Sequence, residues 1–162
     1  LLVGMAYERR HSRLIADYGG VAKVMPRFTA IFLVVTFASI ALPLTNGFVG
    51  EFLILAGAFK AAPVAACFAV VGAVLGAWYM LGAVKRVFFG PLTDPHNAEL
   101  KDVSLREGLL AAPFVLAIVL TGVKPEGVLA LMRPGAERIE SQAHRSALPR
   151  PADAAAVDGA GR

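Results

Sequence analysis

The chain has 162 residues, of which 57% are hydrophobic and 17% are charged, against roughly 25% charged residues in an ordinary soluble domain. Three windows, residues 28–59, 61–84 and 108–123, contain a single charged side chain, that of Glu51. Apolar stretches of this length match the roughly 17 to 25 residues that a helix needs to cross a bilayer core. The composition therefore excludes an ordinary water-soluble globule and indicates an all-α, polytopic transmembrane helix bundle.

The first seven residues are apolar and run directly into a charged segment that contains Arg9, Arg10 and Arg13. A secretory signal peptide has the reverse order, with its positive charges before the apolar stretch. We therefore expect residues 1–7 to be the end of an earlier helix, and the chain to be the C-terminal part of a longer membrane protein.

The first apolar window is interrupted near its middle. Proline has no amide proton to donate within a helix, and glycine accepts unusual dihedral angles. The helix break is expected at Pro43, Thr45, Asn46, Gly47 and Gly50. Two topologies follow: either two short spans are joined by a tight turn, or residues 25–60 form one crossing, a discontinuous helix with a broken middle.

The basic residues of the loops distinguish these topologies. Residues 7–27 carry five basic side chains and residues 85–106 carry four, whereas the connection at residues 60–63 carries one. One broken crossing puts both basic segments on the same side of the membrane, as the positive-inside rule expects. A continuous helix over residues 28–59 would be roughly 48 Å long, more than a core of about 30 Å requires, but tilt and an unwound middle can absorb the excess. We favour the broken crossing.

A second span is predicted at residues 63–87. It contains Gly72 and Gly76, whose small-xxx-small spacing lets another helix approach closely. This spacing indicates packing and not chemistry. Lys60 and Lys85 lie at span ends, where their side chains are expected to reach the membrane interface.

A third span is predicted at residues 105–123, because Ser104 and Glu107 have the spacing of a capping box. Beyond residue 133 the composition shifts to Ala, Pro, Arg, Asp and Gly, which is typical of disorder. We therefore expect a membrane domain over residues 1–132 and a disordered tail over residues 133–162.

Glu51 is the strongest candidate for a functional residue. A carboxylate near the middle of a membrane helix costs about 2.5 to 3.5 kcal/mol on insertion scales, so it needs a partner, water or a function. Glu51 follows Gly47 by four residues, which predicts a place near the first turn of the second half-helix, where the helix dipole favours an anion. The apolar surroundings favour the neutral form instead. These two opposing effects can keep the charged and neutral forms of Glu51 close in free energy, which favours proton transfer. The alternative is that Glu51 forms a fixed ion pair between helices and that the break is a simple kink.

Other polar residues carry weaker signals. Thr36 and Ser39 either line a water path or bond back to their own helix, the second being more common. The single cysteine, Cys67, lies in an apolar window, and the three histidines are scattered, so no haem or zinc site is indicated. No glycine-rich nucleotide loop occurs, and the net charge of +4 follows positive-inside bias and does not indicate nucleic-acid binding.

Three runs of sequence carry a family resemblance. They are Tyr-Glu-Arg-Arg-His-Ser-Arg at residues 7–13, Tyr-Gly-Gly-Val-Ala-Lys-Val-Met-Pro at residues 18–26, and Leu-Pro-Leu-Thr-Asn-Gly-Phe-Val-Gly-Glu-Phe at residues 42–52. Over residues 1–125 the chain resembles the antiporter-like subunit M (chain 4) family of proton-translocating NADH:quinone oxidoreductase, respiratory complex I. The resemblance implies an antiporter-like fold with a discontinuous helix, and Glu51 as its terminal proton-transfer group. Leu44 departs from the family, which more often has glycine there.

The resemblance also implies the molecular context. The partners would be other membrane-arm subunits of complex I, the lipid bilayer and protons, in a multi-pass protein of the bacterial cytoplasmic membrane. Flavin, iron–sulfur clusters and quinone would be handled by other subunits, so the chain would belong to a translocase without redox chemistry of its own. Its proton path would need a glutamate and lysines on other helices. The alternatives are a subunit of a multisubunit sodium/proton antiporter or of a membrane-bound hydrogenase, or a purely structural membrane-arm subunit.

Overall fold

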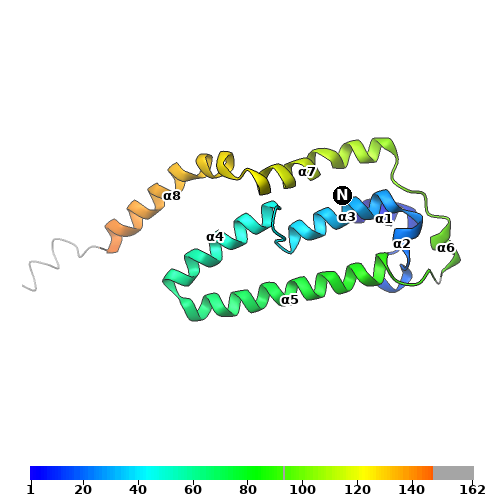
Figure 1. The fold of residues 1–162 in the computed structure, drawn as a ribbon, viewed down its shortest axis with the longest axis horizontal. Coiled ribbons are helices and arrows are strands. Elements are labelled where there is room, and N and C mark those ends of the chain that lie inside the picture. Colours follow the sequence, from blue (N-terminus) through cyan, green and yellow to red (C-terminus); the bar gives the residue numbers. More distant parts are fainter. Residues whose placement is uncertain (93, 148–162) are drawn as a thin grey trace, which may run out of the picture. The chain divides into compact units, whose positions relative to one another are not determined.

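The computed structural model describes residues 1–92 and 94–147, and over these residues all regular structure is helical. The chain forms two units, Leu1–Lys124 and Pro125–Arg162. The helices are α1 (Leu2–Arg10), the 3₁₀ turn η1 (Ile15–Asp17), α2 (Val21–Val24), α3 (Pro26–Ser39), α4 (Asn46–Ala61), α5 (Pro63–Phe88), α6 (Pro95–Ala98), α7 (Leu105–Val123) and α8 (Glu126–Ala147) (Figure 1). The prediction of an all-α chain is confirmed for the described residues.

Two helices, α5 and α7, are long and apolar enough to cross a membrane, and α3 is a shorter apolar helix. The 26 residues of α5 correspond to a length of about 39 Å. At the start of α7, the Ser104 hydroxyl accepts a hydrogen bond from the amide of Glu107, and the Glu107 carboxylate accepts one from the amide of Ser104. The predicted capping box is therefore present.

The interruption between α3 and α4 begins with the C-cap of α3. The amide of Ala41 donates to the carbonyl of Ala38, and the amide of Leu42 donates to the carbonyl of Phe37 at 2.9 Å. Ala41 has a φ of 53°. This pair of bonds around a left-handed residue is a Schellman motif, which usually has glycine in place of Ala41.

A tight turn completes the interruption. The amide of Thr45 donates to the carbonyl of Leu42, with Pro43 and Leu44 between them. Leu44 has a φ of 75°. Proline in the second position and a positive φ in the third are the features of a type II turn, whose third position favours glycine. The chain thus ends one helix and starts the next within six residues, 40–45.

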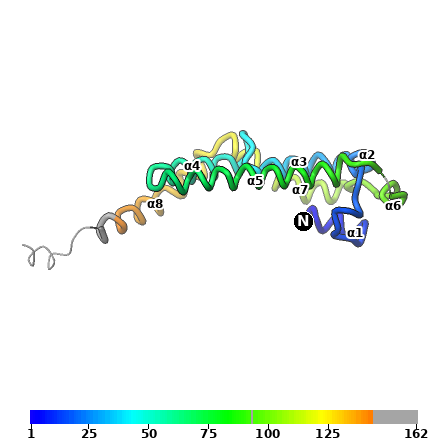
Figure 2. The backbone as a smooth tube through the Cα atoms, turned by 90° about the horizontal axis from the view of Figure 1, so that it is seen from below, coloured from blue at the N-terminus to red at the C-terminus, as the bar shows by residue number. Residues whose placement is uncertain are grey.

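The long helices of Leu1–Lys124 run side by side. Figures 1 and 2 show α3 and α4 following one another in the same general direction, while α5 runs back alongside them. Both α5 and α7 contact α3 as well as α4. Each of these two helices therefore bridges the interruption.

The buried core of this unit lies at one end, where α1, α2, α3 and α5 meet. It consists of Met5, Val21, Met25, Phe28, Val84, Phe88 and Val103. The ring of Phe88 lies 4.7 Å from that of Phe32 and 6.0 Å from that of Phe28, measured between centroids. In contrast, no residue of α4 is buried.

Polar contacts join the two basic segments at this same end. The Arg9 guanidinium donates to both carboxylate oxygens of Glu107 at 2.7 and 2.9 Å, and Arg10 forms an ion pair with Asp94. Asp102 accepts hydrogen bonds of 3.0 Å from the first amides of α3, those of Arg27 and Phe28. Residues 7–27 and 85–106 are therefore in direct contact.

The second unit is described as far as residue 147. Its helix α8 covers residues 126–147, so residues 133–147, where the composition predicts a disordered tail, are helical. Ala, Arg, Glu and Gln make up nine of these 15 residues, and their high helix propensity favours a helix against the opposing effect of Pro134 and Gly135. The rest of the predicted tail, residues 148–162, lies outside the described residues.

Candidate functional site

Glu51 lies on α4, which begins at Asn46. Glu51 is therefore in the second turn, and the first turn holds no acidic residue. The sequence predicts a place near the first turn, where the dipole favours an anion; the structure puts Glu51 one turn later, where the dipole effect is weaker. The cause is local: Thr45 occupies the N-cap position, so the helix begins directly after the turn.

The Glu51 side chain is exposed in this chain, and within the described residues its carboxylate forms no ion pair. The half-buried residues Gly47, Leu55 and Ala58 share the helix face of Glu51, at spacings of four, four and seven residues, yet Glu51 itself is exposed. Within the part of the chain that the structure describes, no cation forms the fixed interhelical ion pair with Glu51 that the alternative requires. The carboxylate is open to water or to a group outside these residues.

The five residues predicted for the break have three different places. Pro43 and Thr45 belong to the non-helical segment, whereas Asn46 and Gly47 form the start of α4. Gly50 lies inside α4, where a side chain would meet open space. Gly50 is therefore a correction: it is not part of the break, and packing does not require a glycine there.

Gly47 has a clear packing role. A Cβ atom on Gly47 would collide with the carbonyl oxygen of Ala38, near the end of α3. The last turn of α3 and the first turn of α4 therefore touch through backbone atoms alone. Any larger residue at position 47 would push the two half-helices apart.

Thr45 holds the turn together from inside. Its side chain is buried, and its hydroxyl donates to the carbonyl of Leu42 at 2.6 Å. The hydroxyl does not cap α4, whose N-terminus has no side-chain cap. The first amides of α4 thus remain free of a capping side chain at the place where the helix restarts.

Three residues at the interruption have no strong sequence signal. Ala41 and Leu44 adopt positive φ without being glycine. Gly122, near the end of α7, is so close that a Cβ atom there would collide with the Leu44 carbonyl oxygen. A glycine in the last turn of an apolar helix is the only hint that the sequence offers for this contact.

A cavity of about 420 Å³ adjoins α3 and α7. Thr36 and Ser39 are among its lining residues, which are otherwise mostly apolar. The Ser39 hydroxyl donates to the carbonyl of Val35 at 3.0 Å, one turn earlier in its own helix. Ser39 therefore bonds back to its helix, as the more common alternative predicts, while lying beside open space.

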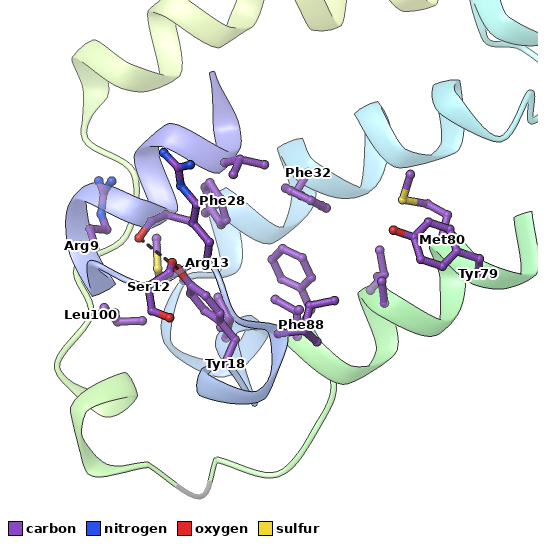
Figure 3. Close-up of a pocket in the computed structure, with 18 residues that line it drawn as sticks. Arg9, Ser12, Arg13, Tyr18, Phe28, Phe32, Tyr79, Met80, Phe88 and Leu100 are labelled. Carbon is purple, nitrogen blue, oxygen red and sulfur yellow. Dashed lines mark hydrogen bonds between the residues drawn. The ribbon is translucent and has the colours of Figure 1, made fainter. Parts of the chain in front are cut away.

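A second cavity, of about 320 Å³, lies at the loop end (Figure 3). Its walls include Phe28, Phe32 and Phe88, and Tyr18 contributes a polar group. The Tyr18 hydroxyl donates to the carbonyl of Ser12 at 2.8 Å, and partial burial raises the pKa of Tyr18 above its ordinary value. This cavity is distant in sequence from Glu51 and belongs to the packed end of the unit.

Charge at the loop end is compensated. Partial burial acts to raise the pKa of Asp102, but hydrogen bonds from the amides of Arg27, Val103 and Phe28 outweigh it, so the pKa lies below its ordinary value.

Lys60 and Lys85 lie in the last turns of α4 and α5, at the helix ends where they are expected. Within the described residues, no cluster of three or more His, Cys, Asp or Glu could hold a metal ion.

Known proteins share much of this sequence and fold. Residues 1–76 match the family described as NADH:quinone oxidoreductase/Mrp antiporter, TM. The chain is 42% identical over 139 residues to NADH-quinone oxidoreductase subunit M of Rickettsia typhi, covering 86% of this chain and 28% of the relative. It is 41% identical over 132 residues to NADH-ubiquinone oxidoreductase chain 4 of Marchantia polymorpha, covering 82% and 27%.

A solved structure agrees. A chain of respiratory complex I from Thermus thermophilus with bound NADH matches with a TM-score of 0.72 and 36% identity, covering 78% of this chain and 26% of that one. The chain thus spans little more than a quarter of the length of the relatives that it matches. The resemblance inferred from the sequence motifs is confirmed: residues 1–76 match the transmembrane, antiporter-like family, and most of the chain is similar to part of subunit M or chain 4 of NADH:quinone oxidoreductase.

Proposed function

We propose that the chain is part of a membrane-arm subunit of respiratory complex I and takes part in proton translocation, with Glu51 as a proton-transfer group. The relatives that carry the names subunit M and chain 4 support the subunit assignment. One observation carries the role of Glu51. It is the single charged residue in three long apolar windows, and it stands just after a helix interruption with its carboxylate unpaired among the described residues.

The proposed crossing consists of α3, the interruption and α4 together. Two observations support one broken crossing over two short spans. Both α5 and α7 contact the two half-helices, and the two basic segments contact each other through pairs such as Arg10 and Asp94. A hairpin between α3 and α4 would carry these basic segments to opposite sides of the membrane.

The chemistry follows from the environment of a carboxyl group in a membrane. Apolar surroundings favour its neutral form, and an approaching cation or water chain favours the carboxylate. The exposed side of α4 lets such a group approach Glu51 from outside the described residues. Glu51 would then take up a proton when the cation withdraws and release it when the cation returns.

The remaining parts of the process belong elsewhere. In this proposal other subunits hold the flavin, iron–sulfur clusters and quinone, and this chain adds no redox centre. Its partners are other membrane-arm subunits, lipids and protons, and its location is the bacterial cytoplasmic membrane. The relative from Rickettsia typhi supports a bacterial source, although a plant relative is nearly as similar.

The test is Glu51→Gln in the protein in its native membrane. Loss of a positioned acid–base group is expected to slow proton transfer at that step by about 10²-fold or more, while the complex still assembles. NADH oxidation and NADH-driven acidification of membrane vesicles are measured together, per amount of assembled complex. Glu99→Gln, an exposed carboxylate in the loop before α7, is the matched control and leaves pumping unchanged.

Three outcomes would contradict the proposal in different ways. Unchanged pumping by an assembled Glu51→Gln complex would leave Glu51 with a structural role. Sodium-dependent exchange in membranes without NADH-linked pumping would support an antiporter subunit. Purification together with a nickel–iron hydrogenase would support the hydrogenase relative.

A further inference from the structure

The last turn of α7 touches the interruption through backbone alone. Gly122 is half-buried and is the last but one residue of α7. A Cβ atom on Gly122 would collide with the carbonyl oxygen of Leu44 and would also meet the carbonyl carbons of Leu44 and Thr45. These atoms belong to the turn and cannot swing away as a long side chain can. Every residue other than glycine must therefore displace either α7 or the turn.

Glycine at this position is not explained by helix formation. In a helix interior glycine is about 1 kcal/mol less favourable than alanine. The other glycine of α7, Gly108, shows the difference. A Cβ atom there would lie 3.9 Å from the Val103 side chain, an ordinary contact. Of these two glycines only Gly122 is required by a neighbouring backbone.

The contact at Gly122 has a counterpart on the other half-helix. Gly47, in the first turn of α4, is held against the Ala38 carbonyl at the end of α3 in the same way. The start of α4 is thus held by α3 at Gly47, and the turn that leads into it is held by α7 at Gly122. Glu51 stands one turn after Gly47 on the same rigid helix.

We propose that Gly122 is a positioning residue for proton transfer: its missing side chain lets α7 hold the Leu44–Thr45 turn, and this contact sets the position of Glu51. The inference rests on the proposed function of Glu51. Gly122 has no side chain that could take up or release a proton. It acts through the turn, because a displaced turn moves the rigid helix that carries the carboxyl group.

The experiment compares Gly122→Ala with Gly108→Ala in the complex in its native membrane. Gly122→Ala is expected to lower NADH-driven pumping per assembled complex by roughly 10-fold, since misplacing a reacting group by about 1 Å can cost up to 100-fold. Gly108→Ala, the same change in the same helix, is expected to pump normally. The pH profile of pumping is expected to shift in Gly122→Ala only.

A rescue variant separates positioning from general damage. Glycine at position 44 lets the turn adopt other conformations, so Leu44→Gly is expected to restore pumping or assembly to Gly122→Ala. If Gly122→Ala pumps like Gly108→Ala, or if Leu44→Gly restores neither pumping nor assembly, the proposal is overturned.

The two proposals can fail separately. In a Glu51→Gln background, Gly122→Ala is expected to add nothing, because both changes affect one step. If Glu51→Gln alone leaves pumping unchanged, the proposed function fails. If Glu51→Gln lowers pumping but Gly122→Ala does not, only the positioning role of Gly122 fails.

Discussion

The two ends of the unit Leu1–Lys124 are held by different forces. At the loop end, buried aromatic rings pack together, and two ion pairs join basic and acidic side chains: Arg9 with Glu107 and Arg10 with Asp94. At the interruption, backbone atoms touch backbone atoms, and Ala41 and Leu44 hold left-handed conformations without being glycine. Such conformations cost of order 1–3 kcal/mol each and persist only where the surroundings impose them.

The two regions therefore have different structural roles. Side chains at the loop end can bury apolar area and neutralise charge, which makes that end an anchor for α3, α5 and α7. Helix α4, which follows the interruption, gains little from burial, since it has no buried residue. The start of α4 and the turn before it are kept in place by close backbone contacts at Gly47 and Gly122, and α4 carries Glu51, whose carboxylate forms no ion pair within the described residues.

The largest effect on stability is expected from Phe88→Ala at the loop end. Phe88 is 2% exposed and contacts the rings of Phe28 and Phe32. Removing a buried aromatic side chain is expected to lower the free energy of unfolding by about 3–5 kcal/mol. Thermal unfolding of the purified protein in detergent measures it. Phe89→Ala, at a neighbouring residue that is 59% exposed, is the control; an equal loss in both variants would contradict a core at this end.

A smaller effect is expected from Asp102→Asn, which weakens the cap on α3. The two carboxylate oxygens of Asp102 accept from the amides of Arg27 and Phe28, and asparagine keeps one acceptor and no charge, so a cost of about 1 kcal/mol is expected at neutral pH. Because the pKa of Asp102 is lowered in the folded chain, its contribution is present above the unfolded pKa of about 4 and is lost as pH falls through the folded value.

The pH dependence gives the measurement for this cap. The difference in melting temperature between the natural protein and Asp102→Asn is expected to shrink as the pH falls below about 4. Glu99→Gln, in the same loop, serves as the control and shows no such difference. A constant difference at every pH would mean that the charge of Asp102 does not stabilise α3.

Local signals made much of this fold predictable. The capping box at Ser104 and Glu107 needs only residues of one turn, and it is present. The individual pairs between the two basic segments, such as Arg10 with Asp94, could not be named from the sequence. Residues 40–45 between α3 and α4 are non-helical and include Pro43, which has no amide proton to donate within a helix.

Long-range contacts account for what the sequence does not show. Asp102 accepts a hydrogen bond from the amide of Arg27, 75 residues earlier in the chain, and Gly122 of α7 touches the turn between α3 and α4. Neither pattern is local. The position of Glu51 in the second turn of α4 depends on where α4 starts: the Thr45 hydroxyl bonds to Leu42 inside the turn, and α4 begins directly after it.

The smallest effect, and the one of opposite sign, is expected at the interruption from Leu44→Gly. Leu44 is 70% exposed and has a φ of 75°, so its side chain gains little from burial while its backbone is strained. Glycine adopts this conformation without the steric cost, and a gain of up to about 1 kcal/mol in the free energy of unfolding is expected. Leu53→Gly, at a partly exposed site inside α4, is the matched control and is expected to lose about 1 kcal/mol, because glycine weakens a helix interior. Thermal unfolding in detergent compares the two variants: opposite signs would show that the interruption is strained where the helix beside it is not, and a loss in both would mean that the Leu44 side chain stabilises the turn.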